Sequence, residues 1–471
     1  MARRRAGAER FSGAPPMKTD YESFFKKISQ GYTWKCLLLI VLVLLLLIPL
    51  SMIDELISER RRTADSAAAN IMEAWGGELI AAGPVLAVPG VRKEESLTKT
   101  ARDGEIIALV EKPFTLFIAP QQLTVGAKFT TEIRYRGIFS VPLFSGELAL
   151  SGSFNPAPAL AALADNETIF LKQARLVIGL SSLKGIRKIE RALWNAEELF
   201  FQPGSGGQER SRPVKPRPLS GGILASVPDG KSSEAKFDIA VAIQGGKQAR
   251  FLPVGQDTRV VVAADWASPS FQGAFLPGGS NITDKGFDAV WDISYLSRDI
   301  PLFWKSEGAN PEYSAALFGV DFFRAIDTYS LNTRAIKFAI LFLLVPFFTL
   351  FLLEVYAKKR IHPVSYLLSG LANLIFYLLL LSFSEHMQFY VAYLIAALAV
   401  TVTMTLYSRS LLSSWRNSWG AGLTASLSYI LLYAALNAES YALLIGSIGA
   451  FAAVALAMFL TRKVDWYESG S

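Results

Sequence analysis

The sequence predicts a membrane protein with six transmembrane helices, one N-terminal and five C-terminal, and a large extracytoplasmic β-sandwich-like domain of antiparallel strands inserted after the first helix. Three observations predict this class. Hydrophobic residues make up 51% of the 471 residues, charged residues only 18%, and the mean hydropathy is +0.32. Such an apolar excess has to be held in membrane spans. Charge-free runs lie near both ends of the chain, and the region between them alternates apolar and polar residues as half-buried strands do.

The run 364–383 is the clearest span. It holds about 20 residues without a charged side chain, enough at about 1.5 Å per residue to cross a hydrocarbon core of about 30 Å. The turn signal Ile-His-Pro at 361–363 precedes it, because proline disfavours helix in the residue before it. Ser-Glu-His at 384–386 ends the run, and another begins at Phe389. Because backbone polar groups in lipid must be satisfied within each helix, the two runs predict a transmembrane hairpin.

The N-terminal part predicts a basic, disordered, cytoplasmic segment at 1–35, followed by a transmembrane helix at 36–53. Eight lysine or arginine residues precede this helix, as the positive-inside rule requires of a cytoplasmic end. A cleaved signal peptide is the alternative, with an apolar core of about 7–15 residues. We favour an uncleaved anchor because the apolar core is longer and Asp54-Glu55 follows it. The single cysteine, Cys36, excludes an intrachain disulfide.

Residues 54–80 predict an amphipathic helical stalk that ends at the glycine pair 76–77. Residues 81–333 predict the β-rich domain, with the insert 203–222 as a loop rich in Gly, Pro and Arg. Three alternating apolar faces carry the strand prediction: Phe129, Thr131, Ile133 and Tyr135; Phe237, Ile239, Val241 and Ile243; and Phe287, Ala289, Trp291, Ile293 and Tyr295.

Residues 334–462 predict five further spans, and 463–471 a cytoplasmic tail. Lysine and arginine mark the loops on one side, at 358–360, 409–416 and 462–463, whereas the turns 384–388 and 437–440 contain neither. This asymmetry agrees with the basic N-terminus and predicts that both termini are cytoplasmic. The β domain is therefore expected outside the cytoplasm.

The same segments carry a resemblance to a known family. The matching residues are Arg360–Pro363, Tyr366–Leu368, Phe376–Leu381, Ser384–His386, Val391–Tyr393, Gly83–Pro89, Ser268–Pro277 and Asp465–Tyr467. In these residues the chain resembles the CreD family of bacterial inner-membrane proteins, over nearly all of its length after about Phe24. The extension 1–22 and the insert 203–222 depart from the family pattern. The resemblance implies that the membrane is the inner membrane of a Gram-negative bacterium and that the β domain lies in the periplasm. It also implies a role in cell-envelope integrity and the envelope stress response, tied to a two-component regulatory system, and it supplies no catalytic motif.

Three residues are candidates for chemistry. Glu385 and His386 are expected at the outer mouth of the hairpin, as a pH-responsive or metal-touching pair, a contact to the exported domain, or a plain interfacial turn. One histidine and one carboxylate are too few ligands for a metal site. His362 lies in the cytoplasmic turn, where helix capping or a lipid headgroup contact is the favoured interpretation.

The sequence favours a non-enzymatic envelope protein whose β domain binds or senses an envelope protein, lipid or peptidoglycan. It contains no phosphate-binding glycine loop, nucleophile elbow, His-Glu-x-x-His or paired cysteines, so no catalytic residue and no cofactor is predicted. The basic net charge of +7 fits membrane anchoring, and no nucleic-acid partner is expected. Two alternatives stay open: a transporter or channel built from the C-terminal spans, and an enzyme on lipid-linked substrates that uses Glu385 and His386. The oligomeric state is not predicted.

Overall fold

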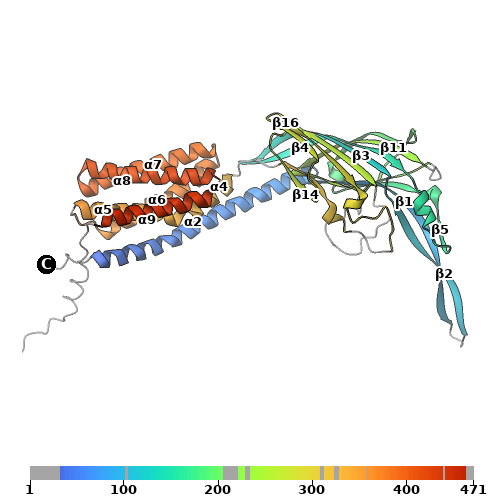
Figure 1. The fold of residues 1–471 in the computed structure, drawn as a ribbon, viewed down its shortest axis with the longest axis horizontal. Coiled ribbons are helices and arrows are strands. Elements are labelled where there is room, and N and C mark those ends of the chain that lie inside the picture. Colours follow the sequence, from blue (N-terminus) through green and yellow to red (C-terminus); the bar gives the residue numbers. More distant parts are fainter. Residues whose placement is uncertain are drawn as a thin grey trace, which may run out of the picture. The chain divides into compact units, whose positions relative to one another are not determined.

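The computed structural model describes residues 32–100, 104–204, 221–228, 234–307, 312–322, 328–357, 359–438 and 441–462 (Figure 1). Contacts divide the chain into two compact units. The span unit comprises the chain up to Arg61 together with the chain from Asp327 onward, and the β unit comprises Arg62–Ile326. The predicted disordered segment 1–35 lies outside the described residues as far as residue 31, whereas residues 32–35 begin helix α2 (Tyr32–Trp75). The predicted features within 205–220 and the motif at 465–467 also lie outside the described residues.

The span unit is built of helices. Their bounds are α2 Tyr32–Trp75, α4 Thr328–Lys337, α5 Ala339–Ala357, α6 Pro363–Ser384, α7 Phe389–Leu412, α8 Trp415–Asn437 and α9 Ala442–Thr461. Five helices within the described residues are long and apolar enough to cross a membrane, namely α2 from Leu37 onward, α5, α6, α7 and α8. The predicted sixth span coincides with α9, and the count of six remains a prediction.

Helix α4 lies partly inside the range that the sequence predicted as β-rich. It begins at Thr328, before the predicted boundary at 333/334. Its Asn332, Ala335 and Ile336 are buried, a spacing that places them on one face of a helix. The charged Arg334 and Lys337 lie within this helix, and the first apolar helix of the second membrane block, α5, begins just after them at Ala339.

Helix α2 runs without interruption from the first span through the amphipathic segment, and it ends at Trp75. Gly76 and Gly77 follow with φ of +123° and +76°, a conformation that glycine adopts readily and that terminates helices. The predicted stop is thereby confirmed. The indole of Trp75 is contacted by two guanidinium groups of the β unit, Arg134 at 3.9 Å and Arg187 at 5.4 Å, a cation–π arrangement that holds the helix end.

The β unit contains two sheets. Its strands are β1 Leu79–Thr100, β2 Gly104–Ile118, β3 Gln122–Arg136, β4 Phe139–Phe154, β5 Glu167–Ile169, β6 Arg175–Leu180, β7 Ile186–Trp194, β8 Glu197–Glu198, β9 Gln202–Pro203, β10 Gly222–Ser226, β11 Ala235–Gly246, β12 Gln248–Leu252, β13 Asp257–Ala264, β14 Pro269–Gly273, β15 Gly279–Thr283, β16 Gly286–Ser294, β17 Phe303–Lys305 and β18 Phe318–Phe322. A short helix, α3 (Ala157–Ala161), follows β4. One sheet has the order β14-β18-β12-β1-β6-β10-β9; in addition β2 and β5 pair with β1, and β17 pairs with β2. The other has the order β15-β16-β13-β3-β4-β11-β7-β8.

Most neighbouring strands are antiparallel, as predicted, but two pairs are parallel. These are β1 with β12 and β3 with β13. Each of them brings together strands more than a hundred residues apart in the chain, so long connections return the later strand in the same direction. Local alternation cannot reveal such pairings.

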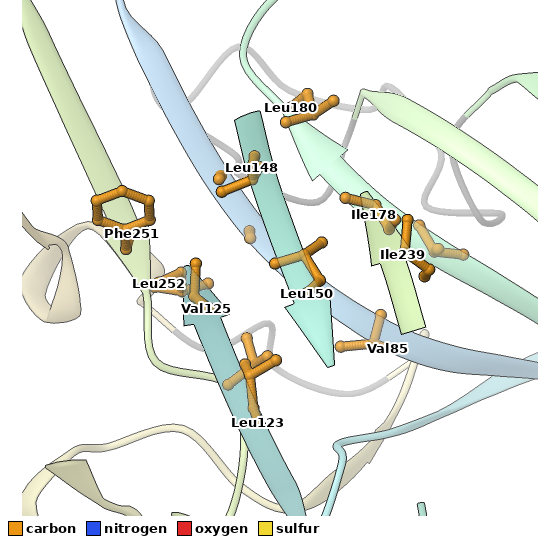
Figure 2. Close-up of a cluster of buried hydrophobic side chains, with 14 of the residues drawn as sticks. Val85, Leu123, Val125, Leu148, Leu150, Ile178, Leu180, Ile239, Phe251 and Leu252 are labelled. Atoms are coloured by element: carbon orange, nitrogen blue, oxygen red, sulfur yellow. The ribbon is translucent and has the colours of Figure 1, made fainter. Parts of the chain in front are cut away.

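The two sheets share one hydrophobic core. Figure 2 shows side chains from both of them, with Val85 and Ile178 from one sheet and Leu123, Leu148 and Ile239 from the other. Each of these side chains is at most 1% exposed. The sheets therefore pack face to face, and burial of this apolar surface is the main source of stability for the β unit.

The predicted strand faces are confirmed on β11, where all four side chains are buried, and on β16 as far as Ile293. The prediction is wrong for the outer half of β3. Ile133 and Tyr135 are 40% and 69% exposed. Pairing between β3 and β13 ends at Phe129, so beyond this residue β3 pairs only with β4. From Ile133 onward the two strands form a two-stranded ribbon, because pairing of β4 with β11 ends at Leu143.

Candidate functional sites

His362 is a helix cap. It precedes Pro363, the first residue of α6, and its Nδ1 accepts a hydrogen bond from the backbone N–H of Val364 at 3.3 Å. Such a cap satisfies a backbone donor that has no partner within the helix. The side chain is otherwise exposed. This contact fits helix capping, one of the two favoured interpretations of His362, and the lipid headgroup contact stays a prediction.

Glu385 and His386 lie at the opposite end of α6, so the structure does not bring them together with His362. Tyr329 of α4 donates a hydrogen bond from its hydroxyl to Glu385 Oε1 at 3.1 Å. One turn further along α4, Asn332 Nδ2 donates to Ser384 Oγ at 3.0 Å. His386 is exposed. The described residues contain no group of three or more His, Cys, Asp or Glu side chains that could hold a metal ion.

A buried carboxylate lies at the end of the span unit that carries His362. Glu354, near the end of α5, is 4% exposed. Its Oε1 accepts a hydrogen bond from Lys35 Nζ at the start of α2, and its Oε2 accepts one from the Tyr366 hydroxyl of α6 at 2.7 Å. The sequence suggested Lys358 as its partner, but that residue lies outside the described part of the chain.

These contacts show which helix ends lie together at one end of the span unit. Lys35, Glu354 and Tyr366 bring together the start of α2, the end of α5 and the start of α6. Lys359 Nζ donates to the carbonyl of Leu412 at 3.2 Å, which adds the end of α7 and places a cation at the negative end of a helix dipole. The loops rich in lysine and arginine therefore lie at the same end as the start of the N-terminal span.

A polar cluster lies inside the helix bundle and begins at a proline. Pro346 of α5 has no N–H, so the carbonyl of Phe342 four residues earlier lacks its helical donor. Asn373 of α6 replaces that donor, since its Nδ2 lies 3.0 Å from the Phe342 oxygen. The hydroxyl of Tyr429 of α8 donates to Asn373 Oδ1 at 2.6 Å, and the hydroxyl of Tyr393 of α7 donates to the Tyr429 carbonyl at 2.6 Å. Four helices are joined by this chain of hydrogen bonds.

A small cavity adjoins this cluster. The centre of a water molecule can occupy about 20 Å³ of it, roughly the space that one water needs. Its lining residues come from four helices: Val345, Pro346, Thr349 and Leu350; Asn373; Met404 and Ser408; and Ala421, Thr424, Ala425, Ser428 and Tyr429. Half of the lining side chains carry oxygen, and none is charged.

Asn373 and Pro346 stand out in the sequence of these spans beside scattered hydroxyl groups, but nothing in the sequence singles out Tyr393 and Tyr429. Tyrosine is ordinary in membrane helices, particularly near interfaces, so its presence in the sequence gives no signal of its own. The buried hydrogen bonds of both tyrosines appear only when α6, α7 and α8 are packed together.

The β unit contains a buried carboxylate of its own. The side chain of Glu167 on β5 is 2% exposed and is contacted by Arg92 of β1 at 2.8 Å and Lys305 of β17 at 2.6 Å. The backbone N–H of Ala164 also donates to it at 3.1 Å. Burial by itself would raise the pKa of Glu167, but the hydrogen bonds from Lys305, Ala164 and Arg92 outweigh burial and lower this pKa to about 2.

We expect Glu167→Gln to loosen the contact of β5 and β17 with the sheet by about 2 kcal/mol at neutral pH. This expected loss of stability is smaller than the loss on breaking a fully buried ion pair, because the side chains of Arg92 and Lys305 remain about a quarter exposed. Since the pKa of Glu167 is depressed on folding, its stabilisation is present above about pH 4.5 and is lost as the pH falls toward 2. Hydrogen–deuterium exchange of peptides covering β5, corrected for the intrinsic rate, should therefore differ between variant and wild type at pH 7 and converge near pH 2.

A matched control for this prediction is Glu197→Gln, which removes an exposed carboxylate on β8. It should leave exchange in β5 unchanged. A difference between Glu167→Gln and wild type that persists at pH 2 would show that the amide disturbs packing, and that the ion pairs are not the cause.

The segment 268–277 is structural. It supplies β14 at the edge of one sheet and then crosses toward β15 of the other. Phe271 stacks edge-on against Phe287 and Trp291, and the Trp291 Nε1 donates to the carbonyl of Phe275 at 3.2 Å. The interpretation of this segment as a structured connection, not a ligand groove, is the one that these contacts support.

The longest two-stranded feature of the β unit is the ribbon of β1 and β2, which extends beyond both sheets (Figure 1). On its outer edges, β5 pairs with β1 only at 90–92 and β17 pairs with β2 only at 116–118. We call the described remainder, 94–100 with 104–114, the β1–β2 arm. Along the arm the two strands pair with each other and with no other described strand. Leu109 and Val110 on it are 69% and 39% exposed.

These features define the class of protein: a multi-pass membrane protein that carries a large two-sheet β unit between its first and second spans. The family model described as inner membrane protein CreD matches residues 31–467. The chain belongs to the CreD family of inner membrane proteins. It is 29% identical to the inner membrane protein CreD of Escherichia coli (strain K12) over 436 residues, which cover 92% of this chain and 93% of that relative. The resemblance seen in the sequence is thereby confirmed, and the protein is placed in the inner membrane with several spans.

Proposed function

We propose that this protein supports cell-envelope integrity without catalysing a reaction. In this proposal its β unit lies in the periplasm and binds an extended segment of another envelope protein. The orientation is supported by Lys359, Arg409 and Arg416, which lie at or next to the helix ends on the side where the N-terminal span begins. The turn 384–388 at the other end of α6 has no lysine or arginine. Positive loops are retained in the cytoplasm.

The single observation that carries the binding proposal is the β1–β2 arm. Both of its outer edges present backbone N–H and C=O groups that no described strand pairs. A two-stranded ribbon is only marginally stable in water, and open edges with apolar side chains attract further strands. The base of the arm already accepts such additions, because β5 and β17 extend its two edges there. A partner segment that adds a strand would continue this pattern and cover Leu109 and Val110.

The test compares two surface changes in the full-length protein. Leu109→Asp with Val110→Asp places charge on the arm, and Leu296→Asp does the same at an 80% exposed leucine elsewhere in the β unit. We expect the arm variant to lose complementation of the envelope defect in a strain without the gene, at unchanged protein level. The Leu296 variant should complement fully. Equal complementation by both variants would contradict a role for the arm.

The orientation is tested on the same position. In a Cys36→Ser background, Leu109→Cys introduces the only thiol on a residue that is 69% exposed. A membrane-impermeant maleimide should label it when the outer membrane is permeabilised and the inner membrane is intact. Labelling only after the inner membrane is lysed would place the β unit in the cytoplasm and would overturn the proposal.

A further inference from the structure

The cavity beside Asn373 is lined by oxygen atoms whose hydrogens point elsewhere. Thr349 Oγ1 donates to Thr424 Oγ1 at 3.2 Å. Thr424 Oγ1 in turn faces the backbone carbonyls of its own helix at 3.0–3.2 Å. Ser428 Oγ donates to the carbonyl of Ala425 at 2.7 Å. Each of these hydroxyls has a single hydrogen, so what it can offer the cavity is a lone pair.

Two further polar groups of the lining, Tyr429 and Asn373, also direct hydrogens away from the cavity. The Tyr429 hydroxyl donates to Asn373 Oδ1, and the Asn373 amide donates to the Phe342 carbonyl that Pro346 leaves free. The groups whose hydrogen bonds are described therefore make the cavity rich in acceptors and poor in donors. A ligand that interacts favourably with these acceptor oxygens must carry a positive charge or supply N–H or O–H donors.

The volume of the cavity and the absence of charged side chains in its lining limit which ligands it can bind. The cavity admits about one species of the size of water, which excludes organic ammonium groups with substituents. Its lining contains no carboxylate, so a divalent ion, which binds through carboxylates and several waters, is disfavoured. Neutral oxygens buried between membrane helices suit a small monovalent cation.

We propose that this cavity, formed by α5, α6, α7 and α8, is a binding site for one monovalent cation of the size of Na⁺. Thr349, Thr424 and Ser428 supply side-chain oxygens, and Asn373 Oδ1 supplies the amide oxygen. Because all of these ligands are uncharged, the affinity is expected in the millimolar range. The site is independent of the β1–β2 arm, so it goes beyond the function proposed above.

The test measures equilibrium binding of ²²Na⁺ to the full-length protein in detergent, at constant ionic strength with choline chloride. We expect saturable binding of about one ion, and a rise in thermal stability with NaCl but not with choline chloride. At ten times the dissociation constant the ratio of folded to unfolded protein should rise about eleven-fold. Thr349→Val and Ser428→Ala each remove one oxygen with little change in volume and should weaken binding at least ten-fold.

The matched control is Thr403→Val on α7, whose hydroxyl donates to the carbonyl of Ala399 and which is exposed and does not line the cavity. It should bind Na⁺ as the wild type does. If Thr349→Val does not fold, Ser428→Ala alone decides. Absence of saturable ²²Na⁺ binding in the wild type, with stability identical in both salts, would show that the cavity holds only water and would overturn the proposal. Equal Na⁺ binding by the control and the cavity variants would show that the ion binds elsewhere in the protein and would also overturn the proposal.

Discussion

Replacing Asn373 by alanine is expected to lower the free energy of unfolding of the span unit by about 2–3 kcal/mol. The change removes the donor to the Phe342 carbonyl and the acceptor of the Tyr429 hydroxyl, both in a buried, apolar environment. Each buried polar group left without a partner costs about 1–3 kcal/mol. Hydrogen bonds between membrane helices are worth less on average, about 0.6 kcal/mol, so the expected value lies at the low end of the sum. Titration of the folded protein with SDS from mixed micelles measures this loss.

A second substitution tests whether the stability lost in Asn373→Ala comes from the Phe342 carbonyl that Pro346 leaves without a helical donor. Pro346→Ala restores an N–H four residues after Phe342, and this N–H can bond the carbonyl that Asn373 now serves. Asn373→Ala should therefore cost less in the Pro346→Ala background than in the wild type. The control is Asn437→Ala at the exposed end of α8, whose side chain bonds only its own helix. Equal costs of Asn373→Ala in both backgrounds would contradict the role assigned to the proline-freed carbonyl.

The membrane helices are predictable from sequence because a span needs only length and the absence of charge. The run predicted at 364–383 became α6 at Pro363–Ser384 within one residue at each end. Helix α4 gives no such signal, because it contains Arg334 and Lys337 and hydropathy alone does not detect it. Its buried face becomes apparent only against α6, where Asn332 meets Ser384.

The polar cluster could be predicted only in part, for a physical reason. A proline within an apolar run is visible in any sequence, and so is a lone asparagine, but the hydrogen bond between Asn373 and Phe342 joins residues 31 positions apart. The partner of Glu354 is further away still, since Lys35 precedes it by 319 positions. The helical spacing rule suggested Lys358, because neighbours at i and i+4 are the only partners that a sequence read locally can offer.

In the β unit, too, local sequence patterns predict the strands but not all of their burial. Alternation predicted the inward faces of β11 and β16 because both strands are covered by the opposite sheet along their length. It failed on β3 beyond Phe129, where the pattern of side chains continues but the covering sheet does not. Period-two alternation therefore indicates a strand, whereas burial of that strand depends on the length of its neighbours.

Replacing Glu354 by alanine is expected to have a second large effect, a loss of about 3 kcal/mol in the stability of the span unit. The carboxylate is 4% exposed and receives hydrogen bonds from Lys35 and Tyr366. Its removal takes this acceptor away from the Lys35 ammonium group and from the Tyr366 hydroxyl, and breaking a buried ion pair in this way costs about 3–5 kcal/mol. We expect a cost at the low end of this range, because the side chain of Lys35 is 24% exposed and a lysine at a helix end can extend toward water.

The loss should appear as a lower fraction of monodisperse full-length protein after heating in mild detergent. Glu354→Gln is the informative comparison, since it keeps an acceptor for the Tyr366 hydroxyl but removes the charge that Lys35 pairs with. We expect Lys35→Met to restore much of the stability of Glu354→Gln, because an apolar side chain of similar length removes the unpaired cation. If Lys35→Met instead destabilises Glu354→Gln further, the lysine stabilises the first span through another contact, and the ion pair is not what joins α2 to α5.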